Sequence, residues 1–287
     1  MRRIAITLGD PAGIGPEVVR KAVESGQLPD ACEYLLIGDA KAGTPGKPDR
    51  ASALAAYEAL MEAAAMLHDG RADAVVTAPV SKGQLQSVGF TFPGQTEFFA
   101  AAQGVTDFGM CLSGTTLTVA LATIHVPLAA VPGLLTVEGI VRTGLLLAGF
   151  LARKSAGLPR IAVAGLNPHA GEDGAFGDEE IRVIGPAIQR LNESGLGIFS
   201  GPGVPDAIFR DAARGQFDGV LAMYHDQGLI PLKLLDFDTA VNVTLGLPKP
   251  RTSPDHGTAF GIAGKNVADA SSMIRAIRLA AEMVAGV

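Results

Sequence analysis

Short apolar runs alternate with longer alanine-rich segments along this chain, and this alternation is the feature that most limits its fold. The runs end in polar or glycine-rich turns, and the alanine-rich segments carry apolar residues at helical spacing. Strands and helices that alternate in this way favour a mainly parallel α/β architecture. Strands are predicted at 3–8, 33–38, 73–78, 117–124, 160–166 and 218–224. Helices are predicted at 17–25, 52–68, 96–103, 137–153, 178–194 and 271–284.

Length, charge and cysteine content exclude several classes of protein. With 287 residues, 48% of them hydrophobic, the chain can bury a large core and is neither disordered nor fibrous. The formal net charge is -6 and no basic run is present, so nucleic acid is not expected as a partner. Cys32 and Cys111 form no metal motif and fit a reducing compartment. The first residues resemble a strand and not a signal peptide, so we expect a cytoplasmic protein.

One stretch has the length and composition of a membrane span. From Phe108 to Val137 the chain has no Asp, Glu, Lys or Arg. Prolines, Gly133 and short β-rich pieces interrupt this stretch, which is unfavourable for a helix facing lipid. We therefore expect buried strands here and no membrane partner.

Three histidines follow predicted strands. His125, His169 and His225 come at or just after strand carboxyl ends, where an open α/β sheet forms its ligand crevice. A single histidine in such a place is more often a hydrogen-bonded structural residue than a ligand. Three converging imidazoles can instead hold a divalent ion and leave coordination positions for substrate. The sequence therefore predicts a catalytic metal site, although no H-E-x-x-H motif supports it.

A second set of polar residues has apolar and proline-rich neighbours. It consists of Lys233, Asn242 and Arg251. An ammonium, an amide and a guanidinium are groups that hold a phosphate or a carboxylate. We therefore predict an anion site, with solvated surface charge as the alternative for Lys233 and Arg251.

Two turns in the first half of the chain carry polar residues that could face an acidic ligand. Lys82 follows a predicted strand, and Gln95 and Thr96 enter a predicted helix. Helix capping by Thr96 and a solvent-exposed lysine are simpler explanations. Because no G-x-S-x-G or S-x-x-K motif is present, a serine nucleophile has no support.

Glycine-rich turns offer further candidates. The opening turn, residues 9–17, could present backbone N–H groups to an anion, but tight packing explains it better. Neither this turn nor residues 195–201 match the G-x-G-x-x-G fingerprint of a Rossmann domain. Near the end of the chain, one loop could approach a cofactor closely, or be a plain surface loop. Its residues are Asp255, His256, Gly257 and Thr258.

Six motifs occur in order along nearly the whole chain. They are GDPAGIGPE, TAPVSK, LNPHAGE, AMYHDQG, VNVTLGLP and RTSPDHGTA. Together they resemble the PdxA family, the 4-hydroxythreonine-4-phosphate dehydrogenases. So many long motifs in one order make this resemblance far more specific than any single motif.

The resemblance implies a fold similar to isocitrate and isopropylmalate dehydrogenases, with two α/β lobes flanking an active-site cleft. It also implies a homodimer with its active site near the interface, NAD or NADP, and a divalent metal such as Zn, Mg or Co. By motif position, the family's metal ligands fall on His125, His169 and His225. Its substrate-binding residues fall on Gln95, Thr96, Lys233, Asn242 and Arg251.

The expected reaction is NAD(P)-dependent oxidation of 4-phosphooxy-L-threonine, with decarboxylation, as a step towards pyridoxal 5'-phosphate. The metal would polarise the C3 hydroxyl group as hydride leaves to the nicotinamide. Lys82, Asp226 and Asp255 are the candidates for the base that takes the hydroxyl proton. The first lobe is expected to span 1–135 with a returning segment at about 255–287, and a dimer-forming second lobe to span 136–254.

Two departures from the family pattern bear on function. Members usually have histidine where this chain has Gln95, so a substrate contact that could be charged becomes a neutral amide. An alternative substrate is therefore a phosphorylated sugar acid, D-erythronate or D-threonate 4-phosphate. The chain also lacks a few tens of residues between Asp39 and Ser52. From another class, a non-redox metal-dependent lyase or metabolite binder stays open, although a mere binder would not need the histidines.

Overall fold

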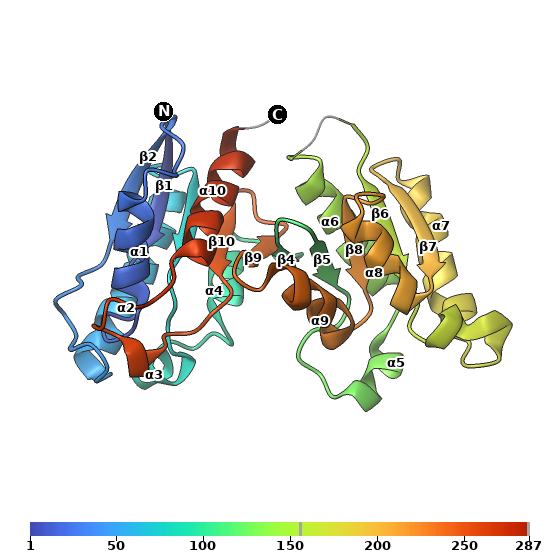
Figure 1. Cartoon of the computed structure of the whole chain (residues 1–287), viewed down its shortest axis with the longest axis horizontal. Helices are drawn as coiled ribbons and strands as arrows, with labels where there is room; N and C mark the ends of the chain where they lie inside the picture. The colour runs from blue at the N-terminus through green and yellow to red at the C-terminus, as the bar shows by residue number, and fades with distance from the viewer. Residues whose placement is uncertain (155–156, 286–287) are drawn as a thin grey trace. The chain divides into compact units, whose positions relative to one another are not determined.

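The computed structural model describes residues 1–154 and 157–285, which form two α/β units (Figure 1). Of the described residues, the first unit contains 1–106 and 241–285, and the second contains 107–154 and 157–240. These bounds fall earlier than the expected ones at 135 and 255. The reason is strand pairing, because the strands within 109–121 pair with those of the second unit, and the strand from 241 pairs within the first.

The sheet of the first unit is mainly parallel. Its strand order is β2-β1-β3-β10-β9, in which β10 is antiparallel to β9 and the other neighbours are parallel. β3 and most of β1 are buried on both faces, as is typical of central parallel strands. The strands are Arg2–Thr7 (β1), Cys32–Ile37 (β2), Ala74–Thr77 (β3), Val241–Leu245 (β9) and Arg251–Pro254 (β10).

Three helices of the first unit, those that begin at Gly15, Arg50 and Lys82, start at a proline or a side-chain cap. The Asp49 side chain accepts from Ser52 N while Ser52 Oγ accepts from Asp49 N, which fixes the start of the second helix after the loop at 40–49. The last helix packs against β10 and the first helix. The helices are Gly15–Glu24 (α1), Arg50–His68 (α2), Lys82–Ser87 (α3), Gln95–Ala102 (α4) and Ser271–Ala285 (α10), with a short 3-10 turn at Phe260–Ile262.

The sheet of the second unit has the order β4-β5-β8-β6-β7. β4 and β5 form an antiparallel pair, and β5, β8, β6 and β7 run parallel. The strands are Gly109–Ser113 (β4), Thr118–Leu121 (β5), Arg160–Ala164 (β6), Ile198–Gly203 (β7) and Gly219–Ala222 (β8). The α-helices are Val131–Leu134 (α5), Val137–Leu151 (α6), Gly185–Glu193 (α7), Pro205–Ala213 (α8) and His225–Asp236 (α9). Shorter helical turns are Leu128–Ala130 (η1), Pro168–Gly174 (η2) and the π-helix Glu180–Ile184 (η3).

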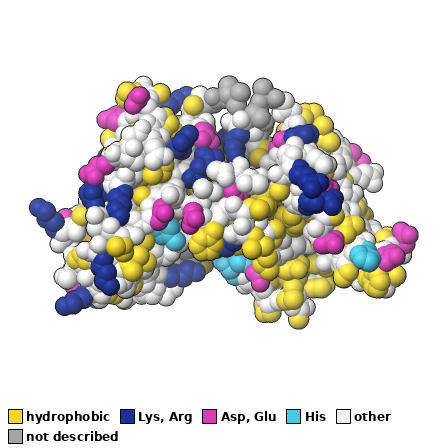
Figure 2. Space-filling view, viewed as in Figure 1, with side chains coloured by type: hydrophobic (Ala, Val, Ile, Leu, Met, Phe, Trp, Pro, Cys, Tyr) yellow, Lys and Arg dark blue, Asp and Glu magenta, His cyan; other side chains and the backbone are white. Residues whose placement is uncertain are grey.

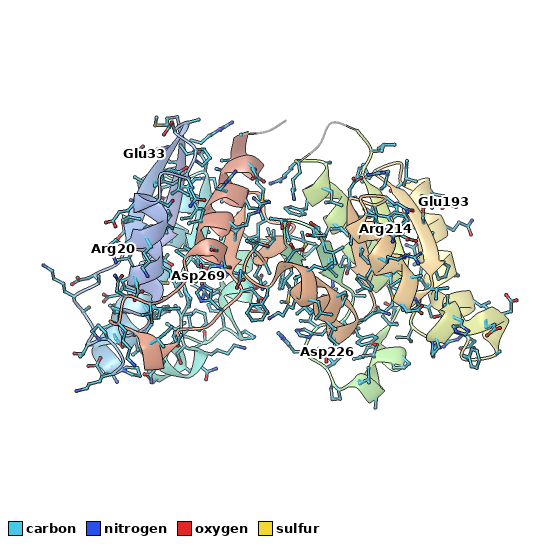
Figure 3. All side chains as sticks on the ribbon, in the orientation of Figure 1. Arg20, Glu33, Glu193, Arg214, Asp226 and Asp269 are labelled. Carbon is cyan, nitrogen blue, oxygen red and sulfur yellow. The ribbon has the colours of Figure 1, made fainter. Side chains whose placement is uncertain are left out.

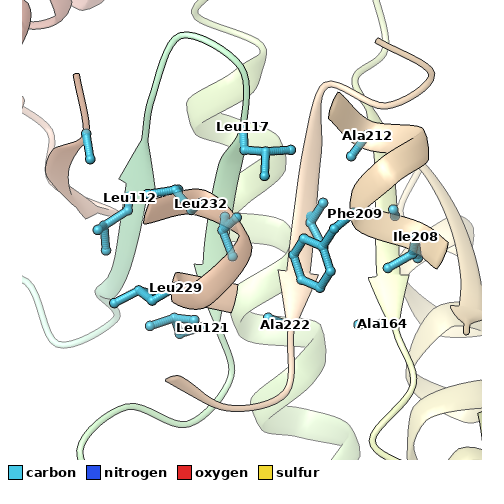
Figure 4. Close-up of a cluster of buried hydrophobic side chains, with 14 residues drawn as sticks. Leu112, Leu117, Leu121, Ala164, Ile208, Phe209, Ala212, Ala222, Leu229 and Leu232 are labelled. Carbon is cyan, nitrogen blue, oxygen red and sulfur yellow. The ribbon is translucent and has the colours of Figure 1, made fainter. Parts of the chain in front are cut away.

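A buried cluster joins α9 to the sheet of the second unit (Figure 4). Leu229 and Leu232 of α9 belong to the same cluster as Leu112 and Leu121 of the strands. Gly228 lies against β5 so closely that a Cβ atom there would meet the side chains of Val119 and Leu121. This packing fixes the helix that begins with His225.

Asp236 anchors the other end of α9. Its carboxylate, 3% exposed, accepts hydrogen bonds from the backbone N–H groups of Thr115, Thr116 and Leu117 and from the Thr115 hydroxyl. Burial alone would raise the pKa of Asp236, but these hydrogen bonds outweigh it and lower the pKa. The ionised carboxylate therefore ties α9 to the turn between β4 and β5.

Asp236→Asn is expected to lower the free energy of unfolding by about 3 kcal/mol at neutral pH, because an amide group replaces an acceptor of several hydrogen bonds. The stabilisation by Asp236 is complete above the ordinary aspartate pKa of about 3.9 and is lost as pH falls through its lower folded value. In urea unfolding, the free energy of unfolding should therefore fall more steeply with decreasing pH in the wild type than in the variant. The control is Asp211→Asn, which removes only a surface ion pair with Arg210.

Every strand and helix predicted from the sequence is present, with small shifts at the ends. The predicted helix at 178–194 begins as the π-helix η3 and continues as α7. The structure adds β4, β7, β9, β10, α3, α5, α8 and α9. The helix α9 is not evident from the sequence, because Gly228 and Pro231, both helix breakers, lie inside it.

No single helix in the described ranges has the length and apolar character to cross a membrane. The pair Leu128–Leu134 and Val137–Leu151 passes by length and composition only when taken together, and it is bent by 96°.

Candidate active site

The three candidate metal ligands follow three neighbouring strands of the second unit. β5, β8 and β6 lie next to one another and run parallel, so their carboxyl ends share one edge of the sheet. His125 comes shortly after β5, His225 begins α9 after β8, and His169 lies in the η2 turn after β6. The topology therefore puts all three on the ligand-binding edge expected from the sequence.

His125 and His225 lie together. Their ring centroids are 5.4 Å apart, and both rings line a cavity of about 420 Å³ with Tyr224 and Asp226. Asp226 Oδ1 lies 2.7 Å from His225 Nδ1, at the start of α9 where Figure 3 labels this carboxylate. This contact fixes the orientation of the His225 ring, in the arrangement that carboxylates have behind metal-bound histidines. Asp226, a candidate base from the sequence, thus has a role in orienting His225.

His169 does not join this pair within the chain. Its Nδ1 lies 3.2 Å from Glu172 Oε2, its ring packs edge-on against Phe176, and its side chain is 67% exposed. In residues 1–154 and 157–285 no three His, Cys, Asp or Glu side chains gather closely enough to hold an ion. The structure therefore brings together two of the three predicted ligands.

The backbone around His169 is unusual. From His169 to Gly174, six consecutive residues have positive φ, and only Gly171 and Gly174 among them are glycines. Left-handed backbone costs about 1–2 kcal/mol for each non-glycine residue, so the turn needs support from its surroundings. Position 171 requires glycine for two reasons: its φ is +80°, and a Cβ atom there would lie 2.7 Å from Glu180 Oε2.

Glu180 supplies that support. This buried carboxylate accepts from Leu166 N at 2.7 Å, from Asn167 N at 2.8 Å and from the Asn167 side chain. Burial alone would raise the pKa of Glu180, but the hydrogen bonds from Asn167 and Leu166 outweigh it and lower the pKa. An ionised Glu180 thus holds the turn that carries His169.

The first unit contains a buried guanidinium. Arg251 is 4% exposed, and its acceptors are the hydroxyl groups of Thr77, Thr96 and Thr244. Among the described residues no carboxylate pairs with it. Burial lowers the pKa of Arg251 to about 10, although the nearby charge of Glu97 opposes this shift. A buried cation with only neutral acceptors favours an incoming anion.

A cavity of about 210 Å³ lies beside Arg251, at the start of α4. Backbone N–H groups in the first turn of a helix attract anions. The side-chain oxygens Gln95 Oε1 and Asn242 Oδ1 are buried and have no hydrogen-bond partner in the described structure. The polar residues lining the cavity are Lys82, Gln95, Thr96, Asn242, Arg251 and Ser253. The cavity can therefore hold a small anion that also carries hydrogen-bond donors.

One detail of the predicted anion site differs from the structure. Thr96 is not the helix cap, because Gly94 occupies that position and the Thr96 hydroxyl accepts from Arg251 instead. Lys233 lies on α9 in the second unit, with Nζ 6.0 Å from the centre of the Phe237 ring. Asn242 and Arg251 lie in the first unit, so a shared anion site with Lys233 stays a prediction.

The loop Asp255–Thr258 meets the opening turn of the chain. Ile14 N donates to Thr258 O at 2.9 Å, and Gly13 lies so close to Thr258 that a Cβ atom would collide with it. The N–H groups of Ala12 and Gly13 bond to Asp10, so the opening turn is a packed turn, as expected. His256 Nε2 is buried and has no partner in the described structure. Asp255 N bonds to the Ser272 hydroxyl.

Sequence reasoning missed Thr77 and Thr244, which bond to Arg251. Thr77 lies 174 positions away along the chain, so no local pattern links the two. A polar residue at the end of the otherwise apolar strand Ala74–Thr77 was the available signal.

Residues 14–280 match the family described as pyridoxal phosphate biosynthetic protein PdxA. The chain is 45% identical to a 4-hydroxythreonine-4-phosphate dehydrogenase of Erythrobacter litoralis, with 99% of this chain and 97% of that protein covered. The chain belongs to the PdxA family. The structure is similar to that of a 4-hydroxythreonine-4-phosphate dehydrogenase from Klebsiella pneumoniae, at 36% identity, a TM-score of 0.84 and 99% coverage of both chains. The family resemblance expected from the motifs is thus confirmed, and the protein is an enzyme of the dehydrogenase class.

The fold prediction is confirmed as well. The isocitrate dehydrogenase of Methylococcus capsulatus matches with a TM-score of 0.51 at 18% identity, over 99% of this chain and 85% of that one. This PdxA family member is shorter than its relatives, because the alignment to the Erythrobacter protein spans 329 positions while the chain has 287 residues. A cavity of about 530 Å³ borders Ala40 and Pro45 in the segment expected to be shortened, and none of the candidate metal or anion ligands lines it.

Proposed function

We propose that this protein oxidises 4-phosphooxy-L-threonine, with loss of CO2, using NAD or NADP and a divalent metal, on the route to pyridoxal 5'-phosphate. The observation that carries this proposal is the buried Arg251, which has only threonine hydroxyl groups as acceptors beside a cavity of about 210 Å³. Such a site fits a phosphate or carboxylate group. The free thiols Cys32 and Cys111 agree with a cytoplasmic enzyme.

His125 and His225 fit a divalent metal such as Zn, Mg or Co. Both imidazoles line one cavity, and Asp226 orients His225 from behind. When bound, the ion supplies Lewis-acid polarisation of the substrate alcohol. The ion would need correctly oriented imidazole rings, and the contact with Asp226 fixes the orientation of the His225 ring.

His169 completes the ligand set from a second copy of the chain. The His169 side chain is exposed, on a turn that Glu180 holds away from the other two histidines. The family resemblance implies a homodimer with its active site near the interface. Apolar side chains of α9 and of Phe237, which follows it, support the homodimer, because Ile230, Leu234 and Phe237 are 60%, 79% and 72% exposed. Figure 2 shows hydrophobic side chains gathered on the visible face over α9 and α5.

The residues of the first unit bind and orient the substrate. Arg251 and Thr96 hold an anionic group, and Asn242 accepts a hydrogen bond from a substrate donor. Lys233, on α9, adds a positive charge from the second unit. Lys82 lines the anion cavity and, together with Asp255, stays a candidate for the base, since Asp226 is engaged with His225.

The loop Asp255–Thr258 fits a nicotinamide cofactor. The orphaned His256 Nε2 needs a hydrogen-bond partner, and Gly257 is exposed and leaves room for close approach. The cofactor supplies the hydride acceptor, and this loop would hold it without a Rossmann fingerprint.

A second candidate substrate is D-erythronate or D-threonate 4-phosphate, favoured by Gln95. Its Oε1 is buried without a partner, and a neutral amide can accept from a hydroxyl group where a charged imidazole would hold an anion. A non-redox lyase or metabolite binder is the remaining alternative.

The test is to follow NADH or NADPH formation with each phosphorylated substrate and added metal. We expect the highest kcat/KM with 4-phosphooxy-L-threonine, and a higher value with D-erythronate 4-phosphate would favour the second candidate. Calorimetric titration with NAD tests the third alternative, a non-redox lyase or metabolite binder. No binding of NAD or NADP, with substrate and metal present, would contradict dehydrogenase activity.

A further inference from the structure

The strand ends that carry the three histidines are joined by hydrogen bonds beyond the end of the sheet. The ladder between β5 and β8 ends at Leu121 and Ala222, and the ladder between β6 and β8 ends at Val163 and Leu221. The ligands lie further along, where the ladders no longer fix one segment against the next. Their relative positions therefore depend on other contacts.

Gln227 supplies such a contact between two of the segments. Its Oε1 accepts from Met223 N at 2.7 Å, and its Nε2 donates to Gly165 O at 2.6 Å. Met223 lies two residues before His225, and Gly165 lies just after β6 at the start of the turn that carries His169. One side chain thus connects the His225 turn to the root of the His169 turn.

Thr123 extends the connection to the third segment. Its hydroxyl donates to Met223 O at 2.8 Å, and its backbone N–H donates to the same oxygen at 3.2 Å. Both backbone groups of Met223 are therefore bonded, one to Thr123 and the other to Gln227. A continuous chain of hydrogen bonds runs from the His125 segment through Met223 and Gln227 to Gly165.

The burial of Gln227 indicates that this geometry matters. The residue is 9% exposed, and a buried amide is favourable only when its oxygen and nitrogen both have partners. An apolar residue would fill the same space without that requirement, but it would leave Met223 N and Gly165 O without these partners. Gln227 touches the backbone of the ligand-bearing turns and none of the three imidazoles by hydrogen bond.

We propose that Gln227 is a positioning residue of the metal site, which sets the His225 turn against the root of the His169 turn. The proposal rests on the metal-binding role given to the histidines above. It predicts that a change at Gln227 alters metal affinity and coordination geometry beyond any loss of fold stability, in the way that outer contacts of metal ligands do.

The experiment uses Gln227→Glu in the full-length protein. The glutamate keeps the shape and can still accept from Met223 N, but it cannot donate to Gly165 O and presents an acceptor to that oxygen. We expect the dissociation constant for Zn²⁺ in calorimetric titration to rise about 10- to 100-fold, and the visible absorption of the Co²⁺ form to shift. The fold is checked by circular dichroism and thermal unfolding.

Gln103→Glu is the matched control. Gln103 also bonds through both amide atoms to one backbone segment, Lys249 N and Lys249 O, but it lies in the first unit. The Gln103→Glu variant should have lower thermal stability, with unchanged Zn²⁺ affinity and an unchanged Co²⁺ spectrum. Thr123→Val serves as a second variant if Gln227→Glu does not fold, because it removes only the hydroxyl bond to Met223 O. A smaller loss of Zn²⁺ affinity is then expected.

The outcomes separate this proposal from the proposed function. If the wild-type protein binds neither Zn²⁺ nor Co²⁺, the metal-binding role fails, and the positioning role fails with it. If the wild type binds and the folded Gln227→Glu variant, or Thr123→Val in its place, binds with unchanged affinity and spectrum, Gln227 has only a structural role and the proposal is overturned.

Discussion

Replacing Arg251 with methionine is expected to lower kcat/KM for the phosphorylated substrate about a thousandfold. Removing one partner of a buried, hydrogen-bonded charge pair costs about 4 kcal/mol, and each 1.4 kcal/mol corresponds to about a tenfold change. Arg251 is 4% exposed, and in the described part of the chain its hydrogen-bond acceptors are threonine hydroxyl groups, so a bound anion would add a charged hydrogen-bond partner. Steady-state kinetics with 4-phosphooxy-L-threonine measures the effect.

The same replacement should not destabilise the protein without ligand. Burial lowers the pKa of Arg251 to about 10, so holding this charge in the interior is unfavourable until an anion arrives. Methionine fills a similar space without a charge. We therefore expect an equal or higher Tm in buffer, and loss of the Tm increase that inorganic phosphate gives the wild type.

Arg210→Met is the control for this prediction, because Arg210 forms an exposed ion pair with Asp211 in the second unit. It should change neither kcat/KM nor the response to phosphate. An Arg251→Met variant with wild-type kcat/KM would contradict the anion site and, with it, the observation on which the proposed function depends.

The sequence was informative wherever local pattern and strand topology determine position. Parallel strands bring their carboxyl ends to one edge, so the location of His125 and His225 after strands was enough to predict that they meet. The apolar neighbours of Arg251 made full exposure unfavourable, although they left a solvated surface charge open. These inferences needed only periodicity and residue type.

Local pattern failed where long-range contacts determine the backbone. Nothing near His169 indicates a left-handed turn, because four of its six positive-φ residues carry side chains and the supporting carboxylate comes from Glu180 on η3. Local pattern also does not reveal that the segment carrying Lys233 is a helix, because α9 continues through Gly228 and Pro231 in the second unit. The helix tolerates these helix-breaking residues because it packs against β5, and the local sequence does not show this packing.

Mixing two inactive variants should decide whether neighbouring chains share the histidines. His125→Ala and His169→Ala are each expected to lose about 100-fold or more in activity and metal affinity, since each removes a ligand. If every site takes His125 and His225 from one chain and His169 from another, a mixed dimer has one site with both substitutions and one intact site. Random mixing would then restore about a quarter of wild-type activity, measured as NADH formation after subunit exchange.

The matched control for this experiment is a mixture of His125→Ala with His225→Ala. The rings of these two residues lie 5.4 Å apart in the same chain, so every site in a mixed dimer still lacks one of them and no activity should return. Recovery in the first mixture alone requires His169 to act across the dimer. If the first mixture also stays inactive, His169 must instead reach the other two ligands within its own chain. The turn at His169–Asp173 would then have to change conformation, which the hydrogen bonds of Glu180 with Leu166 and Asn167 oppose.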